Sequence, residues 1–230
     1  MNAFNLLDAS ANIIPWNAVM ALQKDMGEWV SIIGILACIV LPYLLGSLNF
    51  AIIISRIFFR DDIRKYGSGN AGMTNMLRTY GKLPAAATLL LDMSKGLIAV
   101  VLGRLIFWEI GAAVASLFVV LGHMFPCFYK FKGGKGVATT AMVALATNWF
   151  VFLLLLAVFV IIVAGTKYVS LGSVIGVALY PVFLARFYNT GWNVLAAFII
   201  AAFVIFMHRS NIKRIWSGTE SKISFKSKKQ

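Results

Sequence analysis

The feature that most constrains this chain is a series of long runs that contain no Asp, Glu, Lys or Arg. Four such runs cover residues 31–55, 137–166, 168–185 and 191–207. A helix needs roughly 20 consecutive apolar residues to cross the hydrocarbon core of a bilayer. Strict alternation of apolar and polar residues, which marks a membrane β-strand, is absent from the sequence. The runs therefore predict an all-α protein that crosses a membrane several times.

The composition excludes a soluble domain. Apolar residues make up 60% of the 230 residues and charged residues 13%, whereas soluble domains have about half and about a quarter. One soluble core of this length cannot remove so much apolar surface from water. The two cysteines, Cys38 and Cys127, lie in apolar stretches and are expected to be free thiols. The formal net charge of +13 agrees with cationic cytoplasmic loops or with an anionic ligand.

The positions of the cations predict the topology. They gather in residues 56–82, in residues 130–135, at Lys167 and in the tail from Arg209. Loops rich in Lys and Arg stay in the cytoplasm, so an even number of crossings must separate these groups. The prediction is seven transmembrane helices with the N-terminus outside and the C-terminus in the cytoplasm. They are expected at about 30–57, 84–105, 109–128, 169–187 and 191–208, with two short helices in 137–166 that turn near Asn148–Trp149.

This topology also predicts how the chain is divided. Residues 1–29 are expected to form an N-terminal extension, because they precede the first apolar run and carry more acidic than basic residues. Residues 30–215 are expected to form the membrane-embedded domain. Residues 216–230 are expected to be a basic cytoplasmic tail.

Residues 64–78 form the first of three polar segments on the predicted cytoplasmic side. Gly67, Gly69 and Gly72 have the spacing of a dinucleotide fingerprint, but no soluble βαβ unit surrounds them. One interpretation is a flexible loop. The other is an anion site, in which glycines expose backbone N–H groups while Ser68 and Arg78 supply further donors.

Residues 122–140 form the second polar segment. The spacing differs from that of a P-loop, because Tyr129 and Gly136 stand where a glycine and a Ser or Thr are required. Nucleotide hydrolysis is therefore disfavoured. A glycine-rich turn, Lys135 and a helix that starts near Val137 nevertheless favour phosphate binding. The alternative is an interfacial turn whose lysines extend to the membrane surface.

The third segment contains His208 and Asn211, whose spacing places them on one helix face, where they could together hold a polyol. Asp92 and Lys95 lie within a predicted span. An unpaired charge there is costly, so a buried structural ion pair is expected.

The whole combination resembles the bacterial acyl-phosphate:glycerol-3-phosphate acyltransferases, the PlsY family. The likeness covers about residues 40–215 and includes, in order, Gly46-Ser47, 62–78, Gly81-Lys82, Asp92-x-x-Lys95-Gly96, Gly122-His123-x-Phe125-Pro126, 131–139, 168–173 and His208-Arg209-x-Asn211. Asn49 stands where the family usually has proline, and Met73 where alanine is usual. The His-x4-Asp motif of other acyltransferases is missing, because the fifth residue after His123 is Phe128 and after His208 it is Lys213.

The resemblance implies transfer of a fatty acyl group from acyl phosphate to glycerol 3-phosphate, giving 1-acyl-sn-glycerol 3-phosphate (lysophosphatidic acid) and phosphate in bacterial phospholipid biosynthesis. It assigns to the catalytic pocket Ser68, Arg78, Lys135, His208 and Asn211. It assigns to substrate binding Asn70, Thr74, Asn75, Gly133, Gly134, Gly136, Val137 and Thr139.

The same resemblance implies no cofactor and no metal. The expected partners are acyl phosphate, glycerol 3-phosphate and membrane lipid but no nucleic acid, and coupling to an enzyme that produces acyl phosphate is compatible with them. The expected location is the bacterial cell (inner) membrane, with the active site on the cytoplasmic side.

Two other classes fit the basic segments. A transporter of phosphate compounds could use them as anion sites at a gate, but we find no convincing internal repeat of the kind common in transporters. A structural or lipid-scaffold subunit would not need His208, Lys135 and Arg78 on one face.

Overall fold

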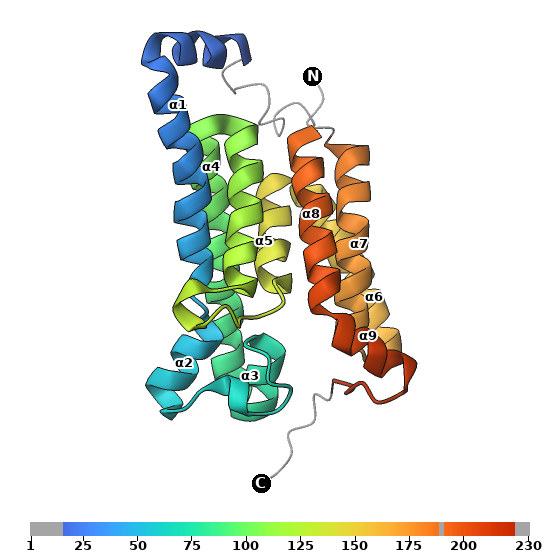
Figure 1. Ribbon diagram of the computed structural model, residues 1–230. Helices are drawn as coiled ribbons and strands as arrows, with labels where there is room; N and C mark the ends of the chain where they lie inside the picture. The colour runs from blue at the N-terminus through green and yellow to red at the C-terminus, as the bar shows by residue number, and fades with distance from the viewer. Residues whose placement is uncertain (1–15, 189–190, 224–230) are drawn as a thin grey trace.

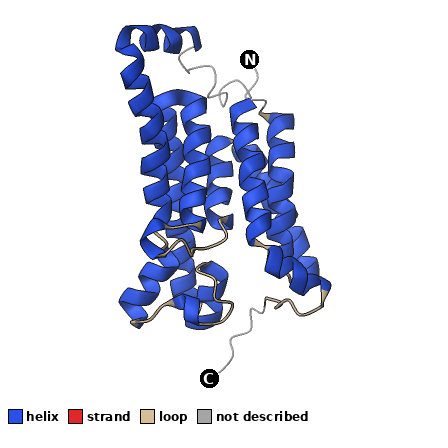
Figure 2. Cartoon of the chain, in the orientation of Figure 1, coloured by secondary structure: helices blue, strands red, loops and turns tan. Residues whose placement is uncertain are grey.

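The structure of the chain is a computed structural model that describes residues 16–188 and 191–223. Residues 1–15 of the expected extension and Lys226, Lys228 and Lys229 of the tail lie outside this range. Within it, all regular structure is helical and there is no strand (Figure 2). The predicted all-α class is therefore confirmed.

Helix α4 lies at the centre of the helix packing. Helix α1 packs on α4, which also contacts α5 and α8, while α7 packs between α6 and α8 (Figure 1). The elements are α1 (Trp16–Ser47), α2 (Phe50–Phe59), η2 (Ile63–Lys65), α3 (Met73–Tyr80), α4 (Lys82–Met124), η3 (Cys127–Tyr129), α5 (Val137–Thr147), α6 (Trp149–Thr166), α7 (Val169–Phe187), α8 (Gly191–Met207) and α9 (Arg209–Trp216).

The predicted first span, 30–57, is broken. Helix α1 ends at Ser47 and α2 starts at Phe50. Asn49 caps α2 by accepting a hydrogen bond from the backbone N–H of Ile52 at 3.1 Å. Its side-chain amide donates to the carbonyl of Ala71 at 3.3 Å. Asn49 thus fixes both the break and the middle of the first polar segment.

Helix α4 is a hairpin of two antiparallel arms. Phe107 and Trp108 have non-helical dihedral angles, at the position where the sequence predicts a break between 105 and 109. Figure 1 shows the arms side by side, joined at the end of the molecule opposite α2 and α3. The arms meet at Gly103 and Gly111, because a Cβ atom at Gly103 would lie 2.3 Å from the carbonyl oxygen of Gly111. Side chains at these two positions would force the arms apart.

The predicted turn in 137–166 is also present. Asn148 separates α5 from α6 and caps α6 by accepting from the N–H of Val151 at 3.0 Å. Helix α5 has only 11 residues, short of the roughly 20 that span a bilayer. By length and apolar composition, the described segments able to cross a membrane are Ser31–Phe59, Lys82–Tyr129, Trp149–Thr166 and Val169–Phe187, and the bent pair α8–α9 makes a fifth if it is one span. The count of seven and the orientation stay predictions.

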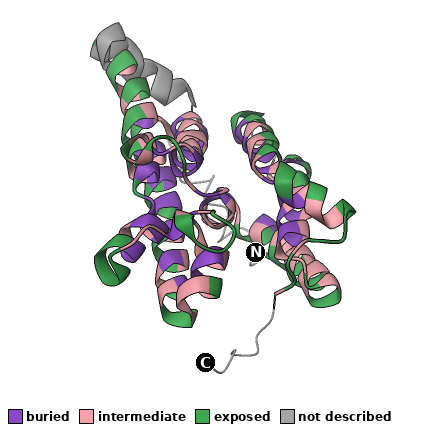
Figure 3. Cartoon of the chain, turned by 60° about the horizontal axis from the view of Figure 1, so that its bottom comes forward, coloured by how far each residue is buried: buried purple, intermediate pink, exposed green. Residues whose placement is uncertain are grey.

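Burial follows the pattern expected for a membrane protein. Buried residues gather where helices face each other, and exposed residues line the outer faces (Figure 3). Large apolar side chains are exposed, among them Ile33 at 64%, Leu105 at 78% and Ile161 at 70%. In a soluble protein such contiguous apolar surface would promote aggregation, whereas here lipid would cover it.

Candidate active site

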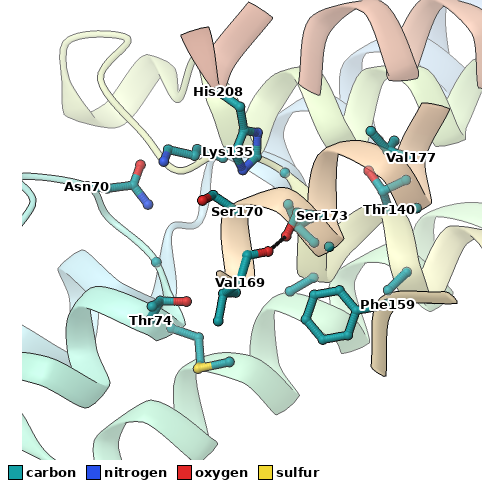
Figure 4. A pocket seen from close by; sticks show the side chains of 18 of the residues that line it. Asn70, Thr74, Lys135, Thr140, Phe159, Val169, Ser170, Ser173, Val177 and His208 are labelled. Carbon is teal, nitrogen blue, oxygen red and sulfur yellow. Dashed lines mark hydrogen bonds between the residues drawn. The ribbon is translucent and has the colours of Figure 1, made fainter. Parts of the chain in front are cut away.

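A cavity of about 930 Å³ lies between α3, α4, α5, α6, α7 and α9. Lys135 and His208 lie at one side of it, and Thr140, Phe159 and Val177 lie at the other (Figure 4). The apolar part is lined by residues that include Leu89, Met93, Phe152, Leu155 and Phe159. One cavity therefore joins a polar, cationic mouth to an apolar stem.

The first polar segment is shaped by the side chain of Asn75, which is 1% exposed. Its amide group donates to the carbonyls of Ile63 at 3.2 Å and Tyr66 at 3.0 Å. Its Oδ1 accepts from the backbone N–H of Ser68 at 3.0 Å. Asn75 lines the cavity, but its side chain forms these hydrogen bonds within the protein, and they hold Ser68 at the cavity mouth.

Arg64 ties the first polar segment to the second. Its guanidinium donates to the carboxylate of Asp62 through Nε at 2.9 Å and Nη2 at 2.7 Å. Its Nη1 donates to the carbonyls of Tyr129 and Lys132, each at 2.9 Å. Hydrogen bonds from Arg64 hold the pKa of Asp62 well below its ordinary value, against the effect of burial. The two glycine-rich segments are thus fixed relative to each other by one planar side chain.

The second segment is a turn built on the end of α4. The N–H groups of Gly133 and Gly134 donate to the carbonyls of Met124 and His123, both at 3.1 Å. These two amides are therefore already paired within the protein. Gly136 has a φ of 82°, a conformation that favours glycine, and caps α5. Gly136 and Val137 line the cavity, so the start of α5 forms part of its wall.

Lys135 extends from this turn into the mouth. Its ammonium donates a hydrogen bond to Oδ1 of Asn211. Burial is the main cause that lowers its pKa from 10.5 to about 8; the charge of Glu220 opposes this effect, and the charges of Arg214 and Arg78 add to it. A lysine that is partly desolvated among other cations is poised to bind an anion.

His208 and Asn211 meet at the junction of α8 and α9, where the chain bends by 55°. Nδ1 of His208 lies 2.7 Å from the carbonyl oxygen of Val204. A carbonyl only accepts hydrogen bonds, so Nδ1 carries a proton and Nε2 of the neutral ring is an acceptor. His208 is 3% exposed and lines the cavity. Its free nitrogen is suited to accept a hydrogen bond from a hydroxyl.

Glu220 is a cavity residue that the sequence analysis did not identify. Its Oε1 accepts from Ser170 Oγ at 2.7 Å and from Asn211 Nδ2 at 2.6 Å, and its Oε2 accepts from Arg214 Nε at 2.7 Å. These hydrogen bonds outweigh the effect of burial and lower its pKa. The sequence contains a feature that could have identified it, because Glu220 is the only acidic residue after Glu109.

The expected ion pair inside the membrane is present. Lys95 Nζ lies 2.8 Å from Asp92 Oδ1, and the side chains are 1% and 2% exposed. His123 joins them with Nδ1 2.8 Å from Lys95 Nζ. Asp92 and His123 also line the cavity.

The structure brings the expected catalytic residues together: Ser68, Arg78, Lys135, His208 and Asn211 all line the cavity. So do Asn70, Thr74, Asn75, Gly136 and Val137 among the expected substrate-binding residues. Gly133, Gly134 and Thr139 do not; Thr139 is fully buried and its hydroxyl donates to the carbonyl of Asp92 at 3.1 Å. Arg78 donates to the carbonyl of Ser221 at 3.5 Å. Glu220 and Ser221 line the cavity too, beyond the domain boundary expected at 215.

The fold and the cavity define a membrane-embedded helical bundle in which a cationic, polar mouth adjoins an apolar stem. The chain matches the model of the glycerol-3-phosphate acyltransferase family over residues 36–218. It therefore belongs to the glycerol-3-phosphate acyltransferase family.

Individual relatives agree. The chain is 44% identical to the glycerol-3-phosphate acyltransferase of Thermoanaerobacter pseudethanolicus over 187 residues, 81% of this chain and 94% of the relative. It is 40% identical to that of Bordetella pertussis over 204 residues, 85% and 95% of the two chains. Among solved structures, it is similar to PlsY, an integral membrane glycerol 3-phosphate acyltransferase, in its glycerol 3-phosphate form, with a TM-score of 0.79 and 35% identity over 83% of this chain and 96% of the other. The lysophosphatidic acid form of PlsY matches with a TM-score of 0.76 and 34% identity over 83% and 95%.

Proposed function

We propose that the protein transfers a fatty acyl group from acyl phosphate to glycerol 3-phosphate, forming 1-acyl-sn-glycerol 3-phosphate and phosphate. The observation that carries this proposal is the cavity itself, in which a cationic mouth opens into an apolar stem. The two substrates need those two environments side by side. Each carries a phosphate, and the donor also carries a fatty chain.

We infer that the mouth binds both phosphates. Lys135 supplies positive charge from the second polar segment. Arg78 supplies it from the first, where Ser68, Asn70 and Thr74 add neutral hydrogen-bonding groups. Charge-assisted hydrogen bonds of this kind are stronger than neutral ones. The stem past Phe159 and Val177 would take the acyl chain.

In the reaction, the hydroxyl oxygen of glycerol 3-phosphate forms a bond to the carbonyl carbon of the acyl phosphate. The bond between that carbon and the phosphate oxygen breaks, phosphate leaves with the electron pair, and the hydroxyl proton ends on a phosphate oxygen. A mixed anhydride has a good leaving group, so positioning and charge stabilisation suffice without a covalent intermediate. His208 Nε2 and Asn211 would orient the attacking hydroxyl.

We further propose that the protein lies in the bacterial inner membrane with the cavity mouth on the cytoplasmic side, where cationic loops are retained. Both acyl phosphate and glycerol 3-phosphate would then reach it from the cytoplasm or from the inner leaflet. An enzyme that produces acyl phosphate would supply the donor.

The proposal is tested with purified protein in lipid, supplied with labelled glycerol 3-phosphate and, separately, acyl phosphate or acyl-coenzyme A. Acylated product formed from acyl phosphate supports the proposal and excludes both a transporter and a scaffold as the sole function. Product formed only from acyl-coenzyme A would reject the proposed donor. No product with either donor would reject the proposed activity.

A further inference from the structure

The buried cluster of Asp92, Lys95 and His123 has no part in the mechanism above, yet its His123 contacts Gly134 in the glycine-rich turn that carries Lys135. The three side chains are at most 5% exposed. Lys95 and Asp92 come from the first arm of α4 and His123 comes from the second. Ionisable groups at membrane depth are costly and are kept mainly where they serve a function.

The hydrogen bonds of Lys95 account for all of its protons. Its Nζ donates to the carbonyls of Gly46 at 3.0 Å and Leu48 at 3.1 Å, at the end of α1. The remaining proton points to His123 Nδ1 at 2.8 Å. Asp92 Oδ1 lies 2.8 Å from Nζ as an ion pair, but without hydrogen-bond geometry. An ammonium has three donors and no acceptor, so the contacts with Gly46, Leu48 and His123 use all three N–H groups of Lys95.

Nδ1 of His123 lies 2.8 Å from the ammonium of Lys95 and 3.5 Å from Oδ1 of Asp92, and we assign the tautomer of His123 from the shorter contact. Because Lys95 donates to Nδ1, that nitrogen is an acceptor, and the proton of the neutral ring must be on Nε2. Nε2 makes no hydrogen bond with any of the described residues. His123 is therefore the reverse of His208, whose Nδ1 carries the proton and whose Nε2 accepts.

The position of Nε2 places this donor at the turn. A Cβ atom on Gly134 would lie 2.1 Å from His123 Nε2, so the imidazole edge touches the backbone immediately before Lys135. The backbone carbonyl of His123 accepts from the N–H of Gly134 at 3.1 Å. His123 also lines the cavity. The N–H groups of Gly133 and Gly134 are paired, which leaves an anion at this turn in need of other donors.

We propose that His123 is a further substrate-binding residue, whose Nε2–H donates a hydrogen bond to a phosphate oxygen held beside Lys135, and that Lys95 fixes the tautomer needed for this. The proposal rests on the proposed function, since it takes a phosphate of acyl phosphate or of glycerol 3-phosphate as the ligand.

The tautomer is tested directly with full-length protein in lipid nanodiscs, labelled with ¹⁵N at histidine. The chain has two histidines, and a His208→Gln sample assigns the signals. The expected result is a protonated Nε2 and an unprotonated Nδ1 at His123, with an Nε2 signal that shifts when glycerol 3-phosphate, inorganic phosphate or a non-hydrolysable acyl phosphonate is added. A proton on Nδ1 alone, or an Nε2 signal that none of these anions shifts, overturns the proposal.

Steady-state kinetics test the contact between His123 and phosphate, and they show which of the two substrates carries that phosphate. His123→Leu removes the donor, whereas His123→Gln keeps an N–H near the position of Nε2. Loss of a hydrogen bond to a charged ligand should raise the KM by about ten- to a hundredfold. We expect this increase in His123→Leu for whichever of the two substrates the residue contacts, with most of the affinity retained in His123→Gln. Equal losses in both variants, with lowered thermal stability, would assign His123 a purely structural role.

Ser116→Ala is the matched control. Ser116 is buried on the same arm of α4, and its hydroxyl donates only to the carbonyl of Ala112 at 2.7 Å, so its loss should leave both KM values unchanged. The two proposals fail separately. An inactive wild-type protein rejects the proposed function, while a phosphate-induced shift at Nε2 would still support the site. An active wild-type protein with no shift and with normal KM values in His123→Leu rejects this inference alone.

Discussion

The ammonium of Lys135 donates a hydrogen bond to the side-chain carbonyl of Asn211, across 76 positions of sequence. The contact joins the turn before α5 to the first turn of α9. Asn211 in turn donates to Glu220, so the glycine-rich turn that carries Lys135 and the C-terminal segment form one network.

Lys135→Ala should lower activity by more than about a hundredfold, as expected when a charged donor at a reacting phosphate is removed. Lys130→Ala should be tolerated, because Lys130 is exposed and does not line the cavity. Both residues belong to the same basic segment, so a general effect of surface charge would make them equivalent. Steady-state assays of the two variants distinguish these possibilities. Near-equal losses of activity would favour a general effect of charge at the membrane surface over a specific binding site.

The pH profile should report Lys135. A lysine is charged below its pKa, which burial lowers to about 8 here. In the ligand-free protein the charge is therefore lost as the pH rises through about 8, and kcat/KM for glycerol 3-phosphate should fall above that pH. Lys135→Arg stays charged over this range, so its profile should lack this limb, whatever its absolute rate. The same fall in wild type and Lys135→Arg would assign the limb to another group.

His208→Gln separates an orienting role from general-base catalysis. Glutamine keeps hydrogen bonding but does not titrate near neutral pH. If His208 orients the hydroxyl, the variant should retain part of its maximal rate and require more glycerol 3-phosphate. A general base should instead cost about 10²- to 10⁴-fold in maximal rate. Initial rates at saturating substrate distinguish the two, and a loss of that size in folded protein would make His208 the base.

Arg64→Lys should lower activity by about tenfold, although the charge is kept. Lysine cannot reach Asp62 and the carbonyls of Tyr129 and Lys132 at the same time, and the loss of one charge-assisted hydrogen bond from the guanidinium accounts for about this factor. Arg56→Lys is the control, because Arg56 also binds Asp62 at 2.9 Å but is 51% exposed and contacts neither carbonyl. Similar activities for the two variants would show that the hydrogen bonds of Arg64 to the glycine-rich turn do not matter for activity.

Single cysteines placed at Lys82, Lys135 and Lys229 should react from one side of the membrane, and one placed at Asp25 from the other. The prediction follows from the clustering of cations; Lys229 and the side chain of Asp25 lie outside the part of the chain that the structure describes. Labelling in sealed vesicles, in a background without Cys38 and Cys127, provides the measurement. Reaction of positions 135 and 229 from opposite sides would contradict both the seven-helix topology and a single cytoplasmic site.

Much of the architecture could be predicted from local sequence. The breaks at Phe107–Trp108 and Asn148 follow from the even number of crossings between cationic groups. The Asp92–Lys95 ion pair follows from the cost of an unpaired charge in a membrane. The break at Asn49 could not be predicted by this argument, because the apolar run continues through it.

The parts of the site that could not be predicted depend on distant contacts. Arg64 acts through carbonyls 65 and 68 positions away, and a carbonyl carries no sequence signal. Glu220 contacts Ser170 across 50 positions and lies in a tail that its cations mark as solvent-exposed. Its isolation as the last acidic residue was a usable signal. The resemblance assigns Gly133 and Gly134 to substrate binding, but the end of α4 already pairs the backbone N–H groups of both.

The central claim is that acyl transfer occurs within one cavity that holds both substrates. The most direct measurement follows purified protein in lipid nanodiscs as it consumes labelled acyl phosphate with and without glycerol 3-phosphate. We predict lysophosphatidic acid and inorganic phosphate in equal amounts, formed only when glycerol 3-phosphate is present and nearly lost in Lys135→Ala. Phosphate release that does not depend on glycerol 3-phosphate, or no lysophosphatidic acid from an intact protein, would contradict the account.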